Sequence, residues 1–451
     1  MNRFFLLAAF FALSACGTMR ARYVRPDIDL PATFPHSDEA ARASLDHWWH
    51  NFSDPQLDAL VDRALKSNND LAIAALTVRA AQLQAHIAVI NPTVSVGYAY
   101  EYSRQFSGNV PAAQAHSLSA SVSYELDLWD QLSASRNAAT WEARASEEDR
   151  RSVAIVLVGT AINLYYQLAN LNQQITLNDC SIAYAEKTLQ IVQVLEAAGG
   201  ATQLEVSESE QSLASHKASR AELSHERMEV HNALTVLLNG VPWPESSERA
   251  AVPDAPPPPV AAGLPASLLH RRPDLRASEA RVRESLARMD ATRLSFYPTI
   301  NLTGSVGAAS TELVQVVQNP LGTLAATLTL PFVQVNEAKI ATAIARTQYE
   351  AATLTFRKVL LQALYDVDNA LSARTQLAEE GEQLERALNA TVTADRLYEI
   401  RYRAGSVPLR LWLDAQEARR QAEILLADNR LARLENYVIV CQALGGGADG
   451  L

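Results

Sequence analysis

Hydrophobic residues alternate with small polar residues in four short segments of the chain: 94–102, 118–126, 300–306 and 324–332. A period of two residues places the apolar side chains on one face of a β-strand and the polar side chains on the other. The runs are about 9–11 residues long, the length that a tilted strand needs to cross a bilayer. The pattern therefore predicts four strands, which belong either to a membrane-spanning barrel or to the half-buried sheet of a soluble protein.

Two long segments, from about 131 to 198 and from about 336 to 404, contain no proline and predict very long helices. In the first segment, hydrophobic residues recur every seven positions, at Leu168, Ile175, Ile182 and Leu189. A seven-residue repeat is the pattern of a coiled-coil seam. Each helix would span roughly 100 Å at 1.5 Å per residue, which is too long for the interior of one compact domain. We therefore expect both helices to protrude and to pack against other long helices.

Two landmarks recur along the chain with one spacing. Pro92 and Pro298 lie in similar seven-residue segments and differ by 206 positions, and so do the pairs Ala198-Gly199 and Ala404-Gly405. Each half of the sequence predicts a helix, two strands, a very long helix, a glycine-containing turn and a further helix. We interpret the chain as two copies of one unit of about 200 residues.

Local signals set the boundaries of these copies. Asp54-Pro55 is a capping residue followed by proline at the first helical position, and the helix that begins there is expected to run to about Val89. The proline run 256–259 predicts extended chain between the copies. The predicted divisions are therefore a signal peptide 1–15, an N-terminal segment 16–53, a first repeat 54–240, a linker 241–266, a second repeat 267–444 and a flexible tail 445–451.

The N-terminus is typical of a bacterial lipoprotein. Arg3 is followed by an apolar segment, 4–13, that is too short for a spanning helix. Leu13-Ser14-Ala15-Cys16 resembles the lipobox, which predicts cleavage before Cys16 and covalent lipid on its thiol. By the same resemblance, Gly17 favours sorting to the outer membrane. A simple secretory signal with a chance cysteine is the alternative.

Four strands cannot close a barrel, because about eight are needed to enclose a filled interior. Open sheet edges are not tolerated in lipid. If the four strands cross a membrane, they must be pooled between chains, and three chains supply twelve strands.

Charge and motifs exclude other classes. The net charge of −11 argues against nucleic acid as a partner, because phosphate binding needs clustered Lys and Arg. The nine histidines are scattered, no spacing resembles a metal site, and no phosphate loop, triad or nucleophile motif occurs, so we expect no enzyme, cofactor or metal. Cys180 and Cys441 lie at different distances along their helices from the predicted glycine turns. A disulfide needs Cα atoms within about 7 Å, so we expect both thiols to be free.

Four motifs of this chain resemble the TolC-like outer membrane factors, specifically the NodT-like lipoprotein branch. They are 48–57 (WWHNFSDPQL), 125–129 (ELDLW), 271–279 (RRPDLRASE) and 297–300 (YPTI). The resemblance covers nearly the whole mature chain. It implies an α+β membrane protein that forms a homotrimeric channel-tunnel, with a twelve-strand transmembrane β-barrel, four strands per chain, and a long periplasmic α-helical barrel. The N-terminal segment and the linker would form an equatorial belt around the helices.

The resemblance also implies a function. The chain would be the outer-membrane exit duct of a tripartite efflux system, anchored by lipid, spanning the outer membrane and extending into the periplasm. Its partners would be a periplasmic adaptor and an inner-membrane pump, usually of the resistance-nodulation-division type. Small toxic compounds would pass through a gated, passive conduit. The alternatives are the duct of a type I protein or peptide secretion system and a lipid-anchored structural coiled coil that spans the periplasm.

The resemblance places adaptor contact and gating at two periplasmic tips, the turns at Gly199-Gly200 and Gly405. A family clamp implies that Tyr402 pairs with Glu205. Arg403 is a further candidate for this clamp. Val407 departs from the family pattern, because some members have a basic residue there.

An acidic residue at the position of Asp414 faces the pore in the family, and threefold symmetry would make it a ring of carboxylates that repel one another. Glu208 is the counterpart of Asp414 in the first repeat. Leu411 departs from the family pattern, because some members have a second acidic residue there. The alternative is that Asp414 and Tyr402 are solvated residues on a helix surface.

Overall fold

The computed structural model describes residues 19–25, 47–88, 90–104, 106, 111–260, 267–312, 320–331 and 334–447. The predicted signal peptide, Cys16, most of the N-terminal segment and most of the tail lie outside the described residues. The chain divides into two compact units. The first consists of Met1–Ile28, Leu76–Glu147 and Ala277–Lys358, and the second of Asp29–Ala75, Glu148–Arg276 and Val359–Leu451. Each unit takes segments from both predicted repeats.

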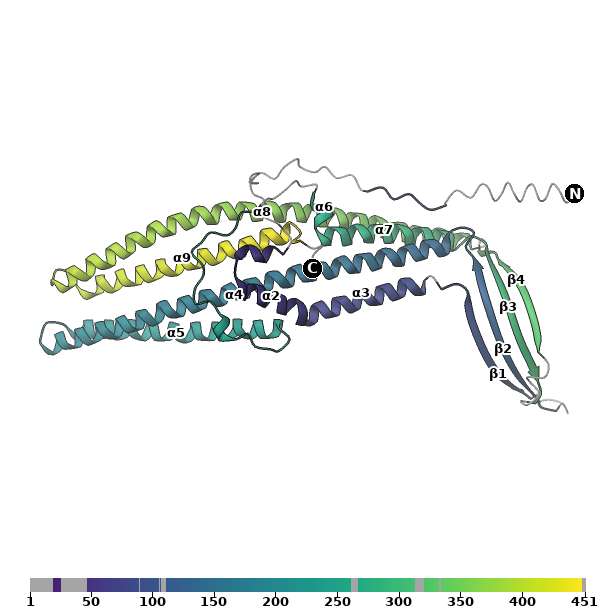
Figure 1. The fold of residues 1–451 in the computed structure, drawn as a ribbon, viewed down its shortest axis with the longest axis horizontal. Coiled ribbons are helices and arrows are strands. Elements are labelled where there is room, and N and C mark those ends of the chain that lie inside the picture. Colours follow the sequence, from purple (N-terminus) through teal and green to yellow (C-terminus); the bar gives the residue numbers. More distant parts are fainter. Residues whose placement is uncertain are drawn as a thin grey trace. The chain divides into compact units, whose positions relative to one another are not determined.

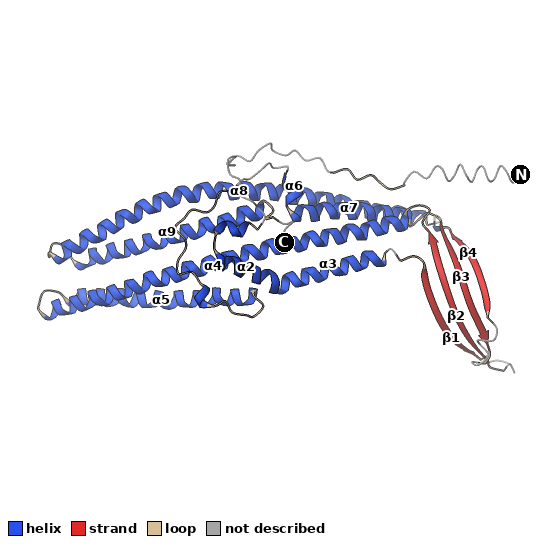
Figure 2. Ribbon diagram, viewed as in Figure 1, coloured by secondary structure: helices blue, strands red, loops and turns tan. Residues whose placement is uncertain are grey.

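Most described residues are helical, and the strands belong to the first unit (Figures 1 and 2). The helices are α2 (Pro55–Ser67), α3 (Asn69–Ile87), α4 (Gln131–Ala197), α5 (Gln203–Leu237), α6 (Leu268–Arg271), α7 (Pro273–Leu294), α8 (Val335–Arg403) and α9 (Leu409–Ala443), with 3-10 turns η1 (Trp48–Phe52) and η2 (Glu245–Ser247). The strands are β1 (Thr93–Ser103), β2 (Ala113–Leu126), β3 (Thr299–Ser310) and β4 (Leu321–Thr329). The two long helices and the four strands that the sequence predicts are confirmed.

The first predicted helix is wrong in one respect, because it is broken into α2 and α3 at Asn68. The backbone of Asn68 is extended, with φ −69° and ψ 131°. Its side-chain oxygen accepts hydrogen bonds from the N–H groups of Asp70 and Leu71 at 2.9 and 3.1 Å. These bonds satisfy the free N–H groups at the start of a new helix, which is why a single Asn divides the segment.

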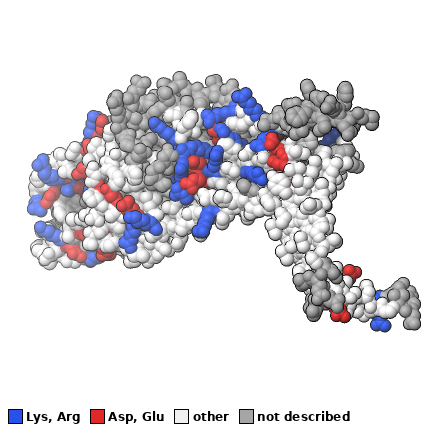
Figure 3. All heavy atoms as spheres, turned by 45° about the vertical axis from the view of Figure 1, so that its right-hand side comes forward, with Lys and Arg blue, Asp and Glu red and all other residues white. Residues whose placement is uncertain are grey.

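The strands form one antiparallel sheet in the order β1-β2-β3-β4. Val96 pairs with Ala120, Ala120 with Val306, and Val306 with Gly322. Because paired residues share a face, most large apolar residues of the four strands align on one face, and most serine and threonine residues align on the other. Figure 3 shows few charged side chains over the strands.

The motif around Asp54 fastens three segments of the second unit. The Asp54 carboxylate accepts a hydrogen bond from the Gln56 N–H at 3.1 Å and caps α2. It also accepts one from the Tyr165 hydroxyl at 3.0 Å and pairs with Arg249 at 2.6 Å. Burial, followed by the charge of Asp54, raises the pKa of Tyr165. The residue that starts the first helix therefore also links α2 to α4 and to the linker.

Aromatic residues beside this network form part of the core of the second unit. Trp48 and Trp49 are fully buried. The Phe52 ring lies between Tyr166 and Tyr437, with centroid distances of 5.4 and 5.0 Å. Such pairs add to the free energy gained by burying the rings. The most specific motif of the sequence is therefore a packing motif in this chain.

Helix α4 is the described helix that is long and apolar enough to cross a membrane by composition. In the apolar 18-residue stretch of α4 that meets this criterion, 61% of the residues are buried inside the chain itself, as expected for a core helix. Cys180 is exposed on α4 and Cys441 is buried on α9, and both are free thiols. Burial raises the pKa of the Cys441 thiol to about 12.

Candidate functional site

One face of the sheet exposes its apolar side chains. Val94 and Val96 in β1 have 71% and 73% of their surface exposed, and Leu324 in β4 has 93%. Soluble monomers rarely leave a large, contiguous apolar patch in contact with water. The face therefore suits contact with lipid or with another protein.

The opposite face is lined by small polar residues that bond across strands. The hydroxyl oxygens of Ser95 and Ser121 lie 2.8 Å apart, and those of Ser123 and Thr303 lie 3.1 Å apart. Among Asp, Glu, Lys and Arg, only Glu101 and Glu125 occur within β1 to β4, and both lie on this polar face. Such a face suits contact with water.

Strands β1 and β4 are the two edges of this sheet. Each edge has a row of backbone N–H and C=O groups that the described sheet does not pair. In lipid, every unpaired backbone group costs several kcal/mol, roughly, because no water can replace the missing bond. A membrane-spanning form of this sheet therefore needs partner strands at both edges.

Two turns connect α4 to α5 and α8 to α9, and they share one hydrogen-bond pattern. At the first, the N–H of Gly199 donates to the Glu196 carbonyl and the N–H of Gly200 to that of Leu195, at 2.9 and 2.7 Å. At the second, Gly405 donates to Tyr402 and Ser406 to Arg401, at 2.8 and 2.9 Å. Gly199 and Gly405 have φ of +74° and +70°, the left-handed conformation that glycine adopts without a steric cost.

The two tips differ in how the following helix begins. Helix α5 starts with a capping box, in which the Glu205 carboxylate accepts from the Thr202 N–H at 2.8 Å and the Thr202 hydroxyl accepts from the Glu205 N–H at 3.5 Å. Helix α9 starts after Pro408, which has no side-chain cap. Glu205 therefore stabilises the first tip locally.

A small hydrophobic cluster holds the two tips together. Its buried members come from three helices, α4, α5 and α9, and they are Val192, Val206, Leu409 and Trp412. Tyr402 of α8 packs against them, with its ring stacked on Trp412 at a centroid distance of 5.3 Å. Tyr184 of α4 meets the same indole edge-on at 5.9 Å. Trp412 therefore contacts both helical hairpins.

Trp412 also takes part in a buried polar network. Its indole N–H donates to the Asp395 carboxylate of α8 at 3.2 Å. Asp395 is buried, and Arg419 of α9 lies 3.3 Å from its other oxygen. A buried carboxylate with two partners fixes the orientation of the indole.

The structure brings together some of the residues predicted for the gate and not others. Tyr402 is half-buried and packs against the cluster that contains Val206, the residue after Glu205. Burial, followed by the charge of Glu205, raises the pKa of Tyr402. Arg403 is exposed and pairs with Glu399 of its own helix at 2.5 Å. Glu208 is half-buried and Asp414 is exposed, and within the described chain neither makes a hydrogen bond or ion pair. The roles of Asp414, Glu208 and Arg403 stay predictions.

Sequence reasoning missed Trp412 and Asp395. Trp412 lies two residues before Asp414, one turn after Leu409, and its counterpart in the first repeat is Val206 of the same cluster. A lone tryptophan in the first turn of a helix that follows a tip was the available signal. The sequence around Asp395 carries no comparable signal, because the residues that contact its carboxylate come from another helix.

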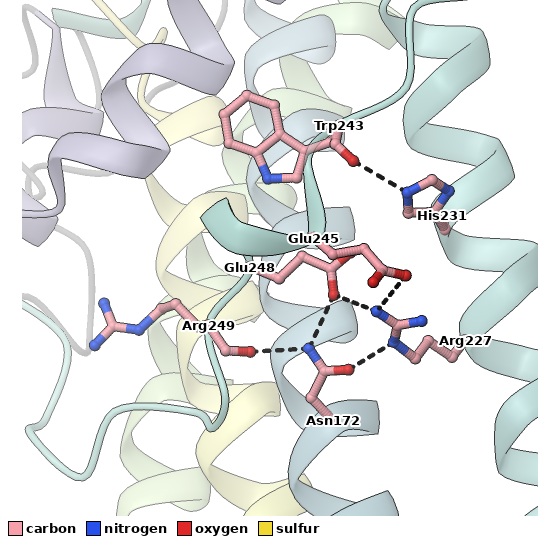
Figure 4. A network of polar contacts seen from close by, with 7 residues as sticks. All are labelled: Asn172, Arg227, His231, Trp243, Glu245, Glu248 and Arg249. Atoms are coloured by element: carbon pink, nitrogen blue, oxygen red, sulfur yellow. Dashed lines mark hydrogen bonds and ion pairs between the residues drawn. The ribbon is translucent and has the colours of Figure 1, made fainter.

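A polar network fastens the linker to α4 and α5 (Figure 4). Arg227 of α5 pairs with Glu248 at 2.7 Å and donates to the Asn172 side-chain oxygen of α4 at 2.8 Å. Asn172 donates in turn to the Arg249 carbonyl at 3.0 Å. The linker is therefore held in place within the second unit by hydrogen bonds and an ion pair. Among the described residues, no group of three or more His, Cys, Asp or Glu could hold a metal ion.

Solved structures of TolC-like outer membrane channels have the same fold as this chain. A membrane protein from Pseudomonas aeruginosa is 26% identical, with a TM-score of 0.84 over 96% of this chain and 99% of that chain. The open state of the MtrE outer membrane channel of Neisseria gonorrhoeae is also 26% identical, with a TM-score of 0.82 over 96% and 99%.

The model of the outer membrane efflux protein family matches residues 60–240 and 264–446, so the chain belongs to that family. The pyoverdine export outer membrane protein OpmQ of Pseudomonas putida is 29% identical over 92% of this chain and 90% of its own length. The probable outer membrane lipoprotein SilC of Salmonella typhimurium is 25% identical over 98% of each. The predicted family and the outer-membrane location are confirmed, and the family consists of channel and exit-duct proteins rather than enzymes.

Proposed function

We propose that this chain forms a homotrimer whose twelve strands close a transmembrane β-barrel, continued into the periplasm by a barrel of long helices. The open edges at β1 and β4 support it, because three copies paired edge to edge satisfy every strand. The two-faced sheet also supports it, since the apolar face then meets lipid and the hydroxyl face encloses water. Each predicted repeat would contribute two strands to the barrel, and the N-terminal segment and the linker would form the equatorial belt around the helices.

The trimer would act as the exit duct of a tripartite efflux system. A passive, gated conduit would accept small toxic compounds from a periplasmic adaptor and an inner-membrane pump, usually of the resistance-nodulation-division type. Relatives named for efflux of toluene and of antibiotics in Pseudomonas putida support this class of substrate. The observation that carries the proposal is the single sheet with an exposed apolar face, a hydroxyl face and two unpaired edges.

A second function is export of a protein or peptide. The toxin and drug export protein A of Aggregatibacter actinomycetemcomitans is 29% identical over 87% of this chain, and it is named for export of a toxin as well as of drugs. The tips would contact the adaptor at Gly199, Gly200 and Gly405 in either case. Cys16 would be acylated, as the name lipoprotein of SilC supports, and no cofactor besides this lipid is proposed.

The gate would lie at the tips. Three copies of Asp414 would form an acidic ring, with Glu208 as its counterpart in the first repeat. Tyr402, Glu205 and Arg403 would hold the helices in the closed arrangement. The exposure of the Asp414 carboxylate supports a position from which it can face a pore.

Planar-bilayer conductance of the lipidated protein tests the duct and the gate separately. Wild type is compared with Asp414→Ala and with Glu385→Ala, which removes the same charge from an exposed position on α8. Discrete channels whose conductance or cation block changes only in Asp414→Ala would support both the duct and the acidic gate. Channels that respond alike in all three proteins would remove Asp414 from the gate, and a folded trimer without channels would contradict the duct.

A further inference from the structure

A cavity of about 260 Å³ lies beneath the proline run of the linker in the second unit. Pro256 and Pro257 form one wall. Arg374 of α8 and Arg433 of α9 line the cavity from two helices that run side by side (Figure 1). Among the described residues, no Asp or Glu lines this cavity. Two cationic residues therefore line one partly open cavity.

Neither arginine has a carboxylate partner. Both are half-buried, and within the described chain no carboxylate oxygen lies within the 4.0 Å of an ion pair with either guanidinium. The one hydrogen bond of the Arg374 side chain goes to the Pro258 carbonyl oxygen at 3.4 Å, which is long for such a bond. Arg430, one turn before Arg433 on α9, is by contrast paired with Asp254 of the linker.

The other polar side chains that line the cavity already make hydrogen bonds within the chain. The Asn436 amide donates to the Ala370 carbonyl at 3.0 Å. The Tyr437 hydroxyl accepts from the Asn51 amide at 3.0 Å. The guanidinium N–H groups are therefore the donors that a bound molecule would find. Half-buried like charges without a counter-ion are costly, and an anion between them removes that cost.

We propose that this cavity binds a small oxyanion, of the class of phosphate or sulfate, between Arg374 and Arg433. The planar guanidinium presents paired N–H donors that match the oxygens of such an anion. The bound anion joins α8 to α9, and the bond from Arg374 to Pro258 extends this connection to the linker. Oxyanion binding therefore stabilises the linker on the helices, whether or not the chain conducts.

Thermal unfolding of the full-length, lipidated protein tests the site with inorganic phosphate as the probe. Each protein is compared in 10 mM phosphate and in chloride at the same ionic strength and pH. A site with a dissociation constant of about 1 mM would lower the unfolding equilibrium constant about ten-fold in phosphate. The response should disappear in the double variant Arg374→Gln, Arg433→Gln. It should persist in Arg430→Gln, which removes a neighbouring arginine that is already paired.

Calorimetric titration of phosphate and of sulfate into the folded proteins gives a second measurement that does not depend on unfolding. Wild type should bind one anion per chain, and each single variant, Arg374→Gln or Arg433→Gln, should bind at least ten-fold more weakly. Replacement of both by Lys should restore part of the affinity, since the charge returns without the paired donors. The absence of any heat of binding in wild type would overturn the proposal. This result is expected if a neighbouring copy fills the cavity with its own carboxylate. Equal binding by the double Gln variant would also overturn it.

Discussion

The sheet of the first unit and the tips of the second unit are built on different principles. The sheet obeys a local rule, because alternate residues of one strand define its two faces. Its stability depends on surroundings that one chain does not supply, since Val96 and Leu324 are exposed and both edges are open. The tips depend on long-range contacts, in which Trp412 joins α4, α8 and α9 within one chain.

This difference separates the two regions functionally. Substitutions in the sheet should act through the membrane and the assembly, and they should depend strictly on which face they occupy. Substitutions at the tips should act within a single chain and depend on packing and hydrogen bonding.

The largest effect is expected from Trp412→Ala. Removing a buried indole should destabilise the tips by about 3–5 kcal/mol, because its contacts and its bond to Asp395 are lost together. Proteolysis near Gly199 and Gly405 should become much faster. Trp412→Phe, which keeps a stacked ring but loses the N–H donor, should recover most of the protection. Equal cleavage of the alanine variant and wild type would show that the cluster does not hold the tips.

A smaller effect is expected from Val96→Arg in β1. A charge on the lipid-facing side of a strand costs about 2–4 kcal/mol near the middle of a bilayer. The midpoint for urea unfolding in liposomes should fall accordingly. Ser95→Arg, one residue earlier on the hydroxyl face, is the matched control and should cost much less. A larger loss in Ser95→Arg would mean that the two faces have been assigned the wrong way round.

The smallest effect concerns pH at the tips. Because the pKa of Tyr402 is raised when folded, the neutral phenol is favoured in the folded tip. This contribution to stability is complete below the ordinary pKa of 10.0 and is lost as pH rises through the higher folded value. Above pH 10, Tyr402→Phe should therefore lose less stability than wild type does. Parallel pH profiles of the two proteins between pH 9 and 12 would contradict this.

The strands and long helices were predictable because their signals are local. A period of two fixes the faces of β1 to β4, and a stretch without proline allows α4 and α8. The break at Asn68 was missed, since an Asn inside a helical pattern becomes a cap only if the next helix starts there.

The site was less predictable because its contacts cross between helices. The proximity of Tyr402 to Glu205 came from the family resemblance. The bond from Trp412 to Asp395 spans 17 residues around a turn, and the cavity between Arg374 and Arg433 joins two helices and the linker. No periodicity within one segment encodes such a meeting.

The central claim is that β1 of one copy pairs with β4 of the next. In one chain these edges are separated by two strands, or roughly 14 Å, so a disulfide between them can form only between copies. Cysteines would be scanned along β1, starting at Ser95, against β4, starting at Thr327, with Cys180 replaced by Ala. The pair Ser95→Cys with Ser121→Cys, on adjacent strands of one chain, is the control that should never link copies.

After mild oxidation in native outer membranes, a denaturing, non-reducing gel separates the covalent species. The account predicts linked dimers and trimers and nothing larger at the matching register, all reversed by reduction. Monomers at every register tested, or ladders that extend beyond three copies, would contradict the closed twelve-strand barrel.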